Sequence, residues 1–308
     1  MLKGLALTPP VVGRISIGRV VEKNGNRLPE KDDEFTITSQ MQGHDGWIAH
    51  PMDETLRKAA GGKLRSIPVR LLFDDPDLNL RASFCMFDRQ SGRPLCVGDG
   101  TKCKRATASG VQSMPCPSPE ACNLAKAGGC KPYGRLNVRI GDDDELGGFI
   151  FRTTGFNSIR TLATRLKYFH AVCGGHLACL PLELRLRGKS TAQSHRTPVY
   201  YVDLVTRVGT SLAQTLANGK ALLQDRVAAG LDQQALDQAA REGLARGAFE
   251  ESAEEGVAVV EEFYPLQPDT QTTDAPVTPS LACRLETKAR RVRPGHSQSI
   301  TGPEGDQR

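Results

Sequence analysis

Four cysteines lie within 28 residues near the middle of the chain, at Cys103, Cys116, Cys122 and Cys130. The surrounding stretch is rich in Gly, Pro, Ser and Lys, and it has too little apolar content to hold a shape by burying surface. Four thiolates that converge on one tetrahedral ion would hold it, and structural zinc takes that number of ligands. The four cysteines therefore predict a structural zinc site.

Other interpretations of these cysteines stay open at this stage. The spacing C-x12-C-x5-C-x7-C is not the paired CxxC pattern of a zinc ribbon, and an iron–sulfur cluster also takes four cysteines. Cys96 is a spare candidate that could replace one of the four, and unrelated free thiols are the structural alternative. Four thiolates fill the coordination sphere, whereas hydrolytic zinc keeps an open position for water. We therefore interpret the site as structural and assign no catalytic residue.

Basic residues surround the four cysteines. They could contact nucleic acid or a protein partner. They could instead offset the negative charge of a zinc–thiolate site, and we favour this local role. The residues are Lys102, Lys104, Arg105, Lys126, Lys131 and Arg135.

A second group of potential ligands recurs at every third residue. Gly174 and Gly175 interrupt this segment, and neighbouring leucines indicate that it enters the core. We therefore expect buried thiols and a packed histidine, with a second metal site as the alternative. The group consists of His170, Cys173, His176 and Cys179.

Two histidines flank Trp47, with two aspartates nearby. A hydrolytic metal site is the functional alternative here, but the spacing matches no helical or hairpin ligand pattern. We favour a surface loop anchored by the tryptophan. The residues concerned are His44, Asp45, His50 and Asp53.

Hydrophobic periodicity predicts the elements that must position these residues. An apolar stripe predicts one packed helix over residues 157–173, with Asn157 or Ser158 as its N-cap. Alternating patterns predict strands in the first two hundred residues, and the turn residues of KNGNRLPEKDD separate two of them. The strands are Val11–Arg14, Ile15–Val21, Phe35–Thr38, Ser66–Phe73, Leu80–Asp88, Pro94–Val97, Arg135–Ile140, Phe149–Thr154, Leu180–Leu186 and Pro198–Val205.

The predicted fold class is α+β, with a mostly antiparallel β body that carries a Cys-rich metal loop. We place a β-rich domain at residues 1–207, with the loop at 96–135. Residues 208–263 read as a helical arm that glycines break, because each glycine costs about 1 kcal/mol in a helix interior. Residues 264–308 have the polar composition of a disordered tail.

Composition limits the function classes. The chain has 308 residues and a formal net charge of +5, which permits an acidic partner without requiring one. We identify no signal peptide and no apolar run of membrane-spanning length, so we expect a cytoplasmic protein without a membrane partner. In that compartment the nine cysteines are expected as reduced thiols or metal ligands.

Several motifs in order resemble one known family. They are GRISIGRV, LRASFCMFD, CVGDG, the loop ending in CKPYGRLNVRI, FRTTGFNSIRTLATRL and LPLELRLRGK. Together they resemble the recombination directionality factor-like proteins of phages and integrative elements, over roughly residues 10–205. Relatives of this kind often carry the label "hydrolase or metal-binding protein".

The resemblance implies a non-enzymatic accessory protein of a mobile genetic element. Such a factor binds a serine integrase on DNA and favours excision in DNA recombination, and direct contact with the DNA is a further partner contact that the resemblance allows. The resemblance supports the four cysteines as ligands by position only, and it does not identify the integrase. The alternatives are a metal-dependent hydrolase or nuclease and a nucleic-acid-binding zinc module.

Overall fold

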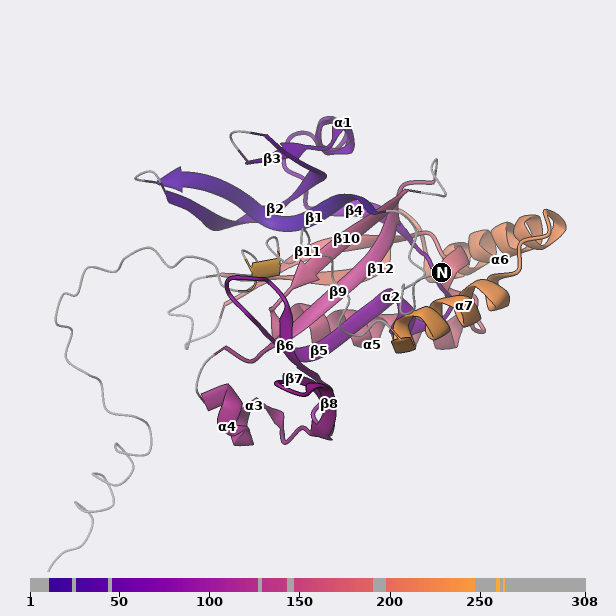
Figure 1. The fold of residues 1–308 in the computed structure, drawn as a ribbon. Helices are drawn as coiled ribbons and strands as arrows, with labels where there is room; N and C mark the ends of the chain where they lie inside the picture. The colour runs from indigo at the N-terminus through magenta and orange to yellow at the C-terminus, as the bar shows by residue number, and fades with distance from the viewer. Residues whose placement is uncertain are drawn as a thin grey trace, which may run out of the picture. The chain divides into compact units, whose positions relative to one another are not determined.

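The computed structural model of the chain describes residues 11–23, 26–43, 46–126, 129–142, 147–190, 198–246, 259–260 and 263. The chain divides into two compact units, Met1–Leu266 and Gln267–Arg308, and every described residue belongs to the first. The predicted tail, residues 264–308, lies outside the described residues. The described part is an α+β fold with a mostly antiparallel sheet, as expected (Figure 1).

The described strands form one twisted sheet. Its main path runs β3-β2-β1-β10-β9-β5-β6-β7-β8, while β4, β11 and β12 branch from β9. Among the described strands, β1 pairs with β10 in parallel, and all the other pairs are antiparallel. The strands are β1 Val11–Lys23, β2 Asn26–Gly43, β3 Gly46–Ala49, β4 Ser66–Leu71, β5 Leu80–Phe87, β6 Pro94–Gly98, β7 Lys102–Thr107, β8 Gly110–Pro115, β9 Lys131–Ile140, β10 Gly148–Thr153, β11 Leu182–Lys189 and β12 Val199–Thr206.

The described helices pack around this sheet or close its loops. None of them is long and apolar enough to cross a membrane. They are α1 Pro51–Ala59, α2 Pro76–Asn79, α3 Ser118–Ala121, α4 Asn123–Lys126, α5 Phe156–Val172, the 3-10 turn η1 Leu177–Cys179, α6 Leu212–Ala228 and α7 Gln233–Arg246.

Helix α5 covers the core face of the sheet, as its apolar stripe predicts. Ile159, Leu162, Leu166 and Phe169 are buried, at the spacing that places them on one side of a helix. Burying each such side chain contributes about 1.5–3 kcal/mol relative to leaving it exposed. At Gly134 of β9 an added Cβ would lie 2.9 Å from Ile159, so the glycine lets the helix approach the strand closely.

Two local predictions are wrong in detail. The N-cap of α5 is Gly155, and the hydroxyl of Ser158 instead accepts the N–H of Val202 at 3.1 Å, which ties the helix to β12. The segment predicted as a turn between the first strands is mostly strand, because β2 begins at Asn26. Its hairpin with β1 extends to the pair Lys23–Asn26, and that pairing satisfies the backbone of polar residues.

The predicted helical arm consists of two helices that pack against the body. Chain direction changes at Gly230, whose φ is +83°. At Gly219 an added Cβ would lie 2.8 Å from the side chain of Leu180, so this glycine allows close contact with the body and is not merely a weak point of the helix. The hydroxyl of Ser211 accepts the N–H of Gln214, and the Gln214 side chain in turn accepts the N–H of Ser211, so α6 begins with a capping box.

Candidate cysteine centre

The predicted cysteine loop contains a hairpin, β7–β8, which we did not predict. Together with α3 and α4 it forms an extension at one end of the molecule (Figure 1). Five cysteines lie on or beside this extension, and we call them the cysteine centre: Cys96, Cys103, Cys116, Cys122 and Cys130. Backbone pairing between β6, β7 and β8 therefore gives the segment a structure of its own.

A tight turn between β6 and β7 sets the register of the centre. The carboxylate of Asp99 accepts the backbone N–H groups of Thr101 at 2.7 Å and Lys102 at 2.8 Å. The N–H of Lys102, followed by that of Thr101, lowers the pKa of Asp99 to about 2. The carboxylate therefore stays ionised at neutral pH, and the turn places Cys103 opposite Gly98.

Gly98 is the point where the backbone of β6 meets two of the predicted ligands. A Cβ at this position would lie 2.8 Å from the Cβ of Cys103 and 2.9 Å from the Sγ of Cys116. The N–H of Cys116 also donates to the carbonyl of Thr101 at 2.8 Å. Cys103 and Cys116 therefore both pack against the backbone at position 98, where any residue other than glycine would force them to move.

Cys122 and Cys130 complete the predicted set. The N–H of Ala125, and after it the N–H of Leu124 and the guanidinium of Arg105, lower the pKa of the Cys122 thiol. Nη2 of Arg105 lies 3.9 Å from that sulfur. Burial raises the pKa of Cys130 to about 11, and the neighbouring thiols add to this rise because thiolates repel one another. The structure thus brings all four predicted cysteines together.

Cys96, predicted only as a spare, belongs to the same centre. It pairs with Arg105 in the register of β6 and β7. Burial and then the hydrogen bond and charge of Cys96 raise the pKa of Cys103 to about 11. Its position two residues before Gly98 was the available signal, because alternate strand residues share a face.

The donor chemistry fits a soft metal ion, but the described residues do not show a finished coordination site. Among them, no three or more His, Cys, Asp or Glu side chains are grouped so that they could hold a metal ion. Five sulfurs supply more ligands than tetrahedral zinc needs. Zinc therefore stays a prediction, with the cysteine centre as its place.

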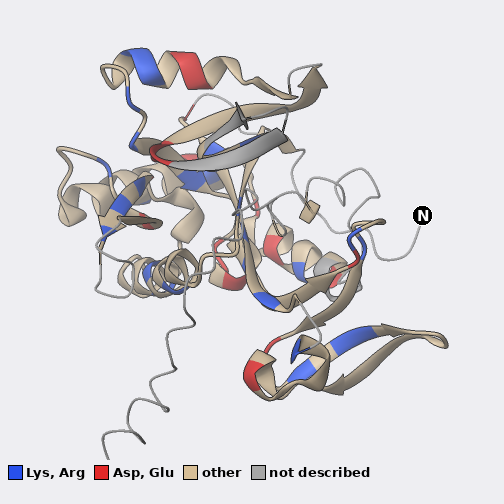
Figure 2. Ribbon diagram, turned by 90° about the vertical axis from the view of Figure 1, so that its left-hand side faces the viewer, with Lys and Arg blue, Asp and Glu red and all other residues tan. Residues whose placement is uncertain are grey.

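The basic residues around the centre separate into distinct roles. Arg105 lies against the thiols, as the local interpretation of these charges predicts. Lys131 and Arg135, both on β9, instead lie beside the rings of Phe263 and Tyr133 respectively. Lys102 and Lys126 are exposed, and Lys104 is half-buried. Figure 2 shows basic positions gathered on the β7–β8 hairpin beside an acidic one in the adjoining short helix.

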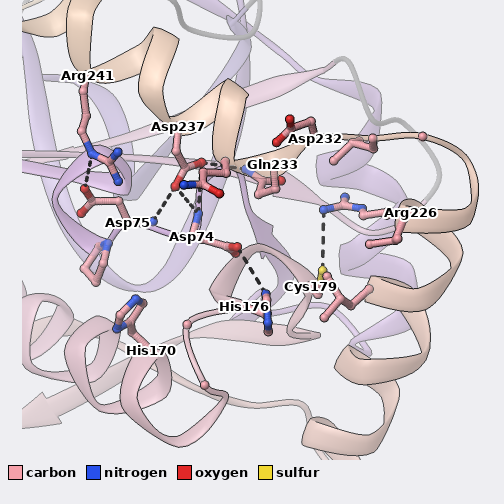
Figure 3. A pocket seen from close by; sticks show the side chains of 18 residues that line it. Asp74, Asp75, His170, His176, Cys179, Arg226, Asp232, Gln233, Asp237 and Arg241 are labelled. Carbon is pink, nitrogen blue, oxygen red and sulfur yellow. Dashed lines mark hydrogen bonds and ion pairs between the residues drawn. The ribbon is translucent and has the colours of Figure 1, made fainter.

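The second group of potential ligands does not converge. His176 approaches Asp74, with 3.7 Å between Nδ1 and Oδ2, and Cys179 lies 3.9 Å from Nη1 of Arg226. The thiol of Cys173 points to the carbonyl of His170 at 3.5 Å. Three of the four residues line a cavity of about 820 Å³ between α5, α6 and α7, with side chains that face different partners (Figure 3).

This cavity borders a polar contact that we did not predict. The carboxylate of Asp237 on α7 is buried and accepts the N–H of Asp75 at 2.9 Å and that of Asp74 at 3.1 Å (Figure 3). Arg241 adds an ion pair with Asp75 at 2.9 Å. The contact docks α7 on the loop after β4. Nothing in the local sequence distinguishes Asp237 from a surface helix residue.

The histidine group around Trp47 has a structural role where it is described. Nδ1 of His50 accepts the N–H of Met52 and caps α1, and burial lowers the pKa of His50. Asp53 accepts the N–H of Ile37 at 2.7 Å, and the guanidinium of Arg14 lies 3.8 Å above the ring of Trp47. His44 and Asp45 lie outside the described residues.

Comparison with known proteins bears on the region that contains the cysteine centre. The family model described as Gp3-like, recombination directionality factor-like, matches residues 12–207. No curated protein and no solved structure matches the chain. The matched region runs from β1 through β12, including the extension with its cysteines, and leaves out α6 and α7. Since the match spans well over half of the sequence, the chain belongs to the recombination directionality factor-like family.

Proposed function

We propose that this protein is a non-enzymatic accessory factor of a mobile genetic element that binds a serine integrase on DNA and favours excision. The observation that carries the proposal is the family match over residues 12–207. It supports a role in recombination for the whole β body. The identity of the recombinase as a serine integrase is our inference from the family.

Such a role requires differential binding. A partner shifts a conformational equilibrium only if it binds one state more tightly than the other. Reversing a population from about 1:99 to 99:1 requires roughly 10⁴-fold preference between the two states. A rigid contact surface on the factor favours such discrimination, because little of the binding free energy is then lost in ordering the surface.

We further propose that zinc in the cysteine centre supplies this rigidity. Cys103, Cys116, Cys122 and Cys130 would hold the ion, with Cys96 as the fifth thiol at hand. Arg105 supports this assignment, because a cation beside the sulfurs favours their ionised form. When bound, zinc would crosslink β7, the residue after β8, the junction of α3 with α4 and the residue before β9. This is a structural contribution and not a catalytic one.

The test of function is a recombination assay with purified proteins. A serine integrase from the same genetic element is incubated with DNA that carries either integration or excision sites. Adding the protein should raise excision and reduce integration, without cleavage of DNA in the absence of the integrase. Unchanged direction with every integrase of the same element would contradict the proposal. Metal-dependent DNA cleavage by the protein alone would favour a nuclease.

The test of zinc is metal analysis of protein purified without air, together with one substitution and a matched control. We expect about one zinc per chain from the four-ligand count. Cys116→Ser should lose the metal and loosen the extension. Cys173→Ser removes a half-buried thiol outside the centre and should keep the metal. Equal metal content in both variants, or none in the wild type, would contradict the zinc assignment.

A further inference from the structure

A short C-terminal segment packs on the sheet face opposite α5. Val259 and Phe263 are fully buried there, in a cluster with Cys85, Phe87 and Tyr133. Register places Cys85 and Tyr133 on the same face of β5 and β9, while the core residues of these strands face α5. The segment therefore covers a second apolar surface that is separate from the main core.

Phe263 fills a built site on this face, which we call the aromatic socket: Phe87, Lys131 and Tyr133. Its ring meets Phe87 edge-on at 4.9 Å between centroids and Tyr133 at 5.9 Å. The Lys131 ammonium donates to the carbonyl of Phe263 at 3.1 Å and lies 5.4 Å from its ring. Ring, cation and backbone contacts together make a specific site for an aromatic residue.

A row of arginines lies to one side of the aromatic socket. Arg81 of β5 and Arg152 of β10 both pair with Arg135 of β9, so the three lie in one row on the face of the socket. The Arg135 guanidinium lies 5.9 Å from the ring of Tyr133. Burial, and then the charge of Arg135, lower the pKa of Arg81 to about 10. A negatively charged ligand group beside Arg81 would relieve this repulsion between like charges.

The segment that occupies the aromatic socket comes from a strongly acidic sequence. FEESAEEGVAVVEEFYP, residues 249–265, contains six glutamates, two of which directly precede Phe263. The socket lies within the region matched by the family model, whereas Phe263 lies beyond it. The matched region thus carries the socket, and a residue C-terminal to that region fills it.

We propose that the aromatic socket and its arginine row form a protein-docking groove for an acidic peptide with an aromatic anchor, which the chain's own segment occupies until a partner's segment replaces it. The proposal rests on the proposed function only in taking the partner to be the recombinase. A tethered segment acts at an effective concentration of the order of mM. The apparent affinity for an external peptide is the intrinsic affinity multiplied by the fraction of time that the groove is empty.

The experiment uses the full chain and a fluorescent peptide of residues 255–267, EGVAVVEEFYPLQ. Fluorescence anisotropy should show binding to the Phe263→Ala variant that is about tenfold or more tighter than to the wild type, because the internal competitor is weakened. Phe156→Ala, which truncates a 58% exposed ring on α5, is the matched control and should behave as the wild type. A peptide with alanine in place of its phenylalanine should bind at least tenfold more weakly.

The charge component is tested by adding Arg81→Gln to Phe263→Ala, which should weaken peptide binding and reduce its salt dependence. Absence of peptide binding by a folded Phe263→Ala variant would overturn the proposal. So would an affinity equal to that of the wild type, or equal binding of a duplex oligonucleotide and the peptide.

Hydrogen exchange of the wild type provides a second measurement that needs no folded variant. Excess unlabelled peptide should speed exchange around residues 259–263, and unchanged exchange would overturn the proposal. Neither experiment involves a recombinase, so a negative result here leaves the excision assay as an independent test of the proposed function.

Discussion

The replacement Gly98→Ala tests the geometry of the cysteine centre. The new methyl group would lie 2.8 Å from the Cβ of Cys103, 2.9 Å from the Sγ of Cys116 and 3.0 Å from the carbonyl oxygen of Lys102. Two of these atoms are backbone or directly attached to it, so they cannot move by a change of rotamer. Overpacking of this kind costs about 1–3 kcal/mol, and we expect the upper part of that range.

Thermal unfolding and thiol labelling measure the effect. A loss of about 2–3 kcal/mol should lower the unfolding temperature by roughly 5–10 °C for a domain of this size. Cys103 and Cys116 should also react faster with a thiol reagent, because β6 no longer covers them. Gly43→Ala on β2 is the matched control, since its nearest neighbour would be an ordinary 3.6 Å away. Equal stability and equal labelling of the two variants would refute the geometry.

Three further predictions concern the body. Asp237→Ala should lower the free energy of unfolding by about 2–3 kcal/mol and speed amide exchange in α7, since two backbone N–H groups lose their acceptor. Asn79→Ala should cost a similar amount in chemical denaturation, because this buried amide bonds Leu72 and Phe73. Arg207, followed by Arg70, lowers the pKa of Asp142 to about 2. The ionised carboxylate therefore contributes fully to the free energy of unfolding above pH about 4, and this contribution is lost toward pH 2. Unfolding of wild type and Asp142→Asn should therefore differ near neutral pH and converge in acid.

Local sequence patterns predicted the elements that bury apolar residues on one face only. The stripe of α5 and the alternation of β9 and β10 correspond to burial on one face, so the helix and the hairpin are confirmed. The β7–β8 hairpin was not predicted, because β8 is exposed at nearly every position and shows no alternation of apolar and polar residues. Its strand state comes from pairing with β7, which is a property of the fold.

The neighbourhood of the candidate site could be predicted from the sequence, whereas its metal stays a prediction. The four cysteines of the polar stretch lie near one another in the structure, but the described residues show no group that could hold a metal ion. Cys96 lies near the other cysteines because of the register between β6 and β7, and the amino-acid composition does not predict that register. The same holds for Arg81, Arg135 and Arg152, because separate strands bring them into one row.

The parallel pairing of β1 with β10 has a consequence for synthesis on the ribosome. Val11 and Gly148 are partners, so β1 can pair along this edge only after more than a hundred further residues have been synthesised. At about 5–20 residues per second, this interval lasts roughly 7–27 seconds. Closing so long a loop also costs about 4 kcal/mol in chain entropy. The nascent β1–β2 hairpin therefore presents an open strand edge to other chains during this time, which makes early synthesis the stage most exposed to aggregation.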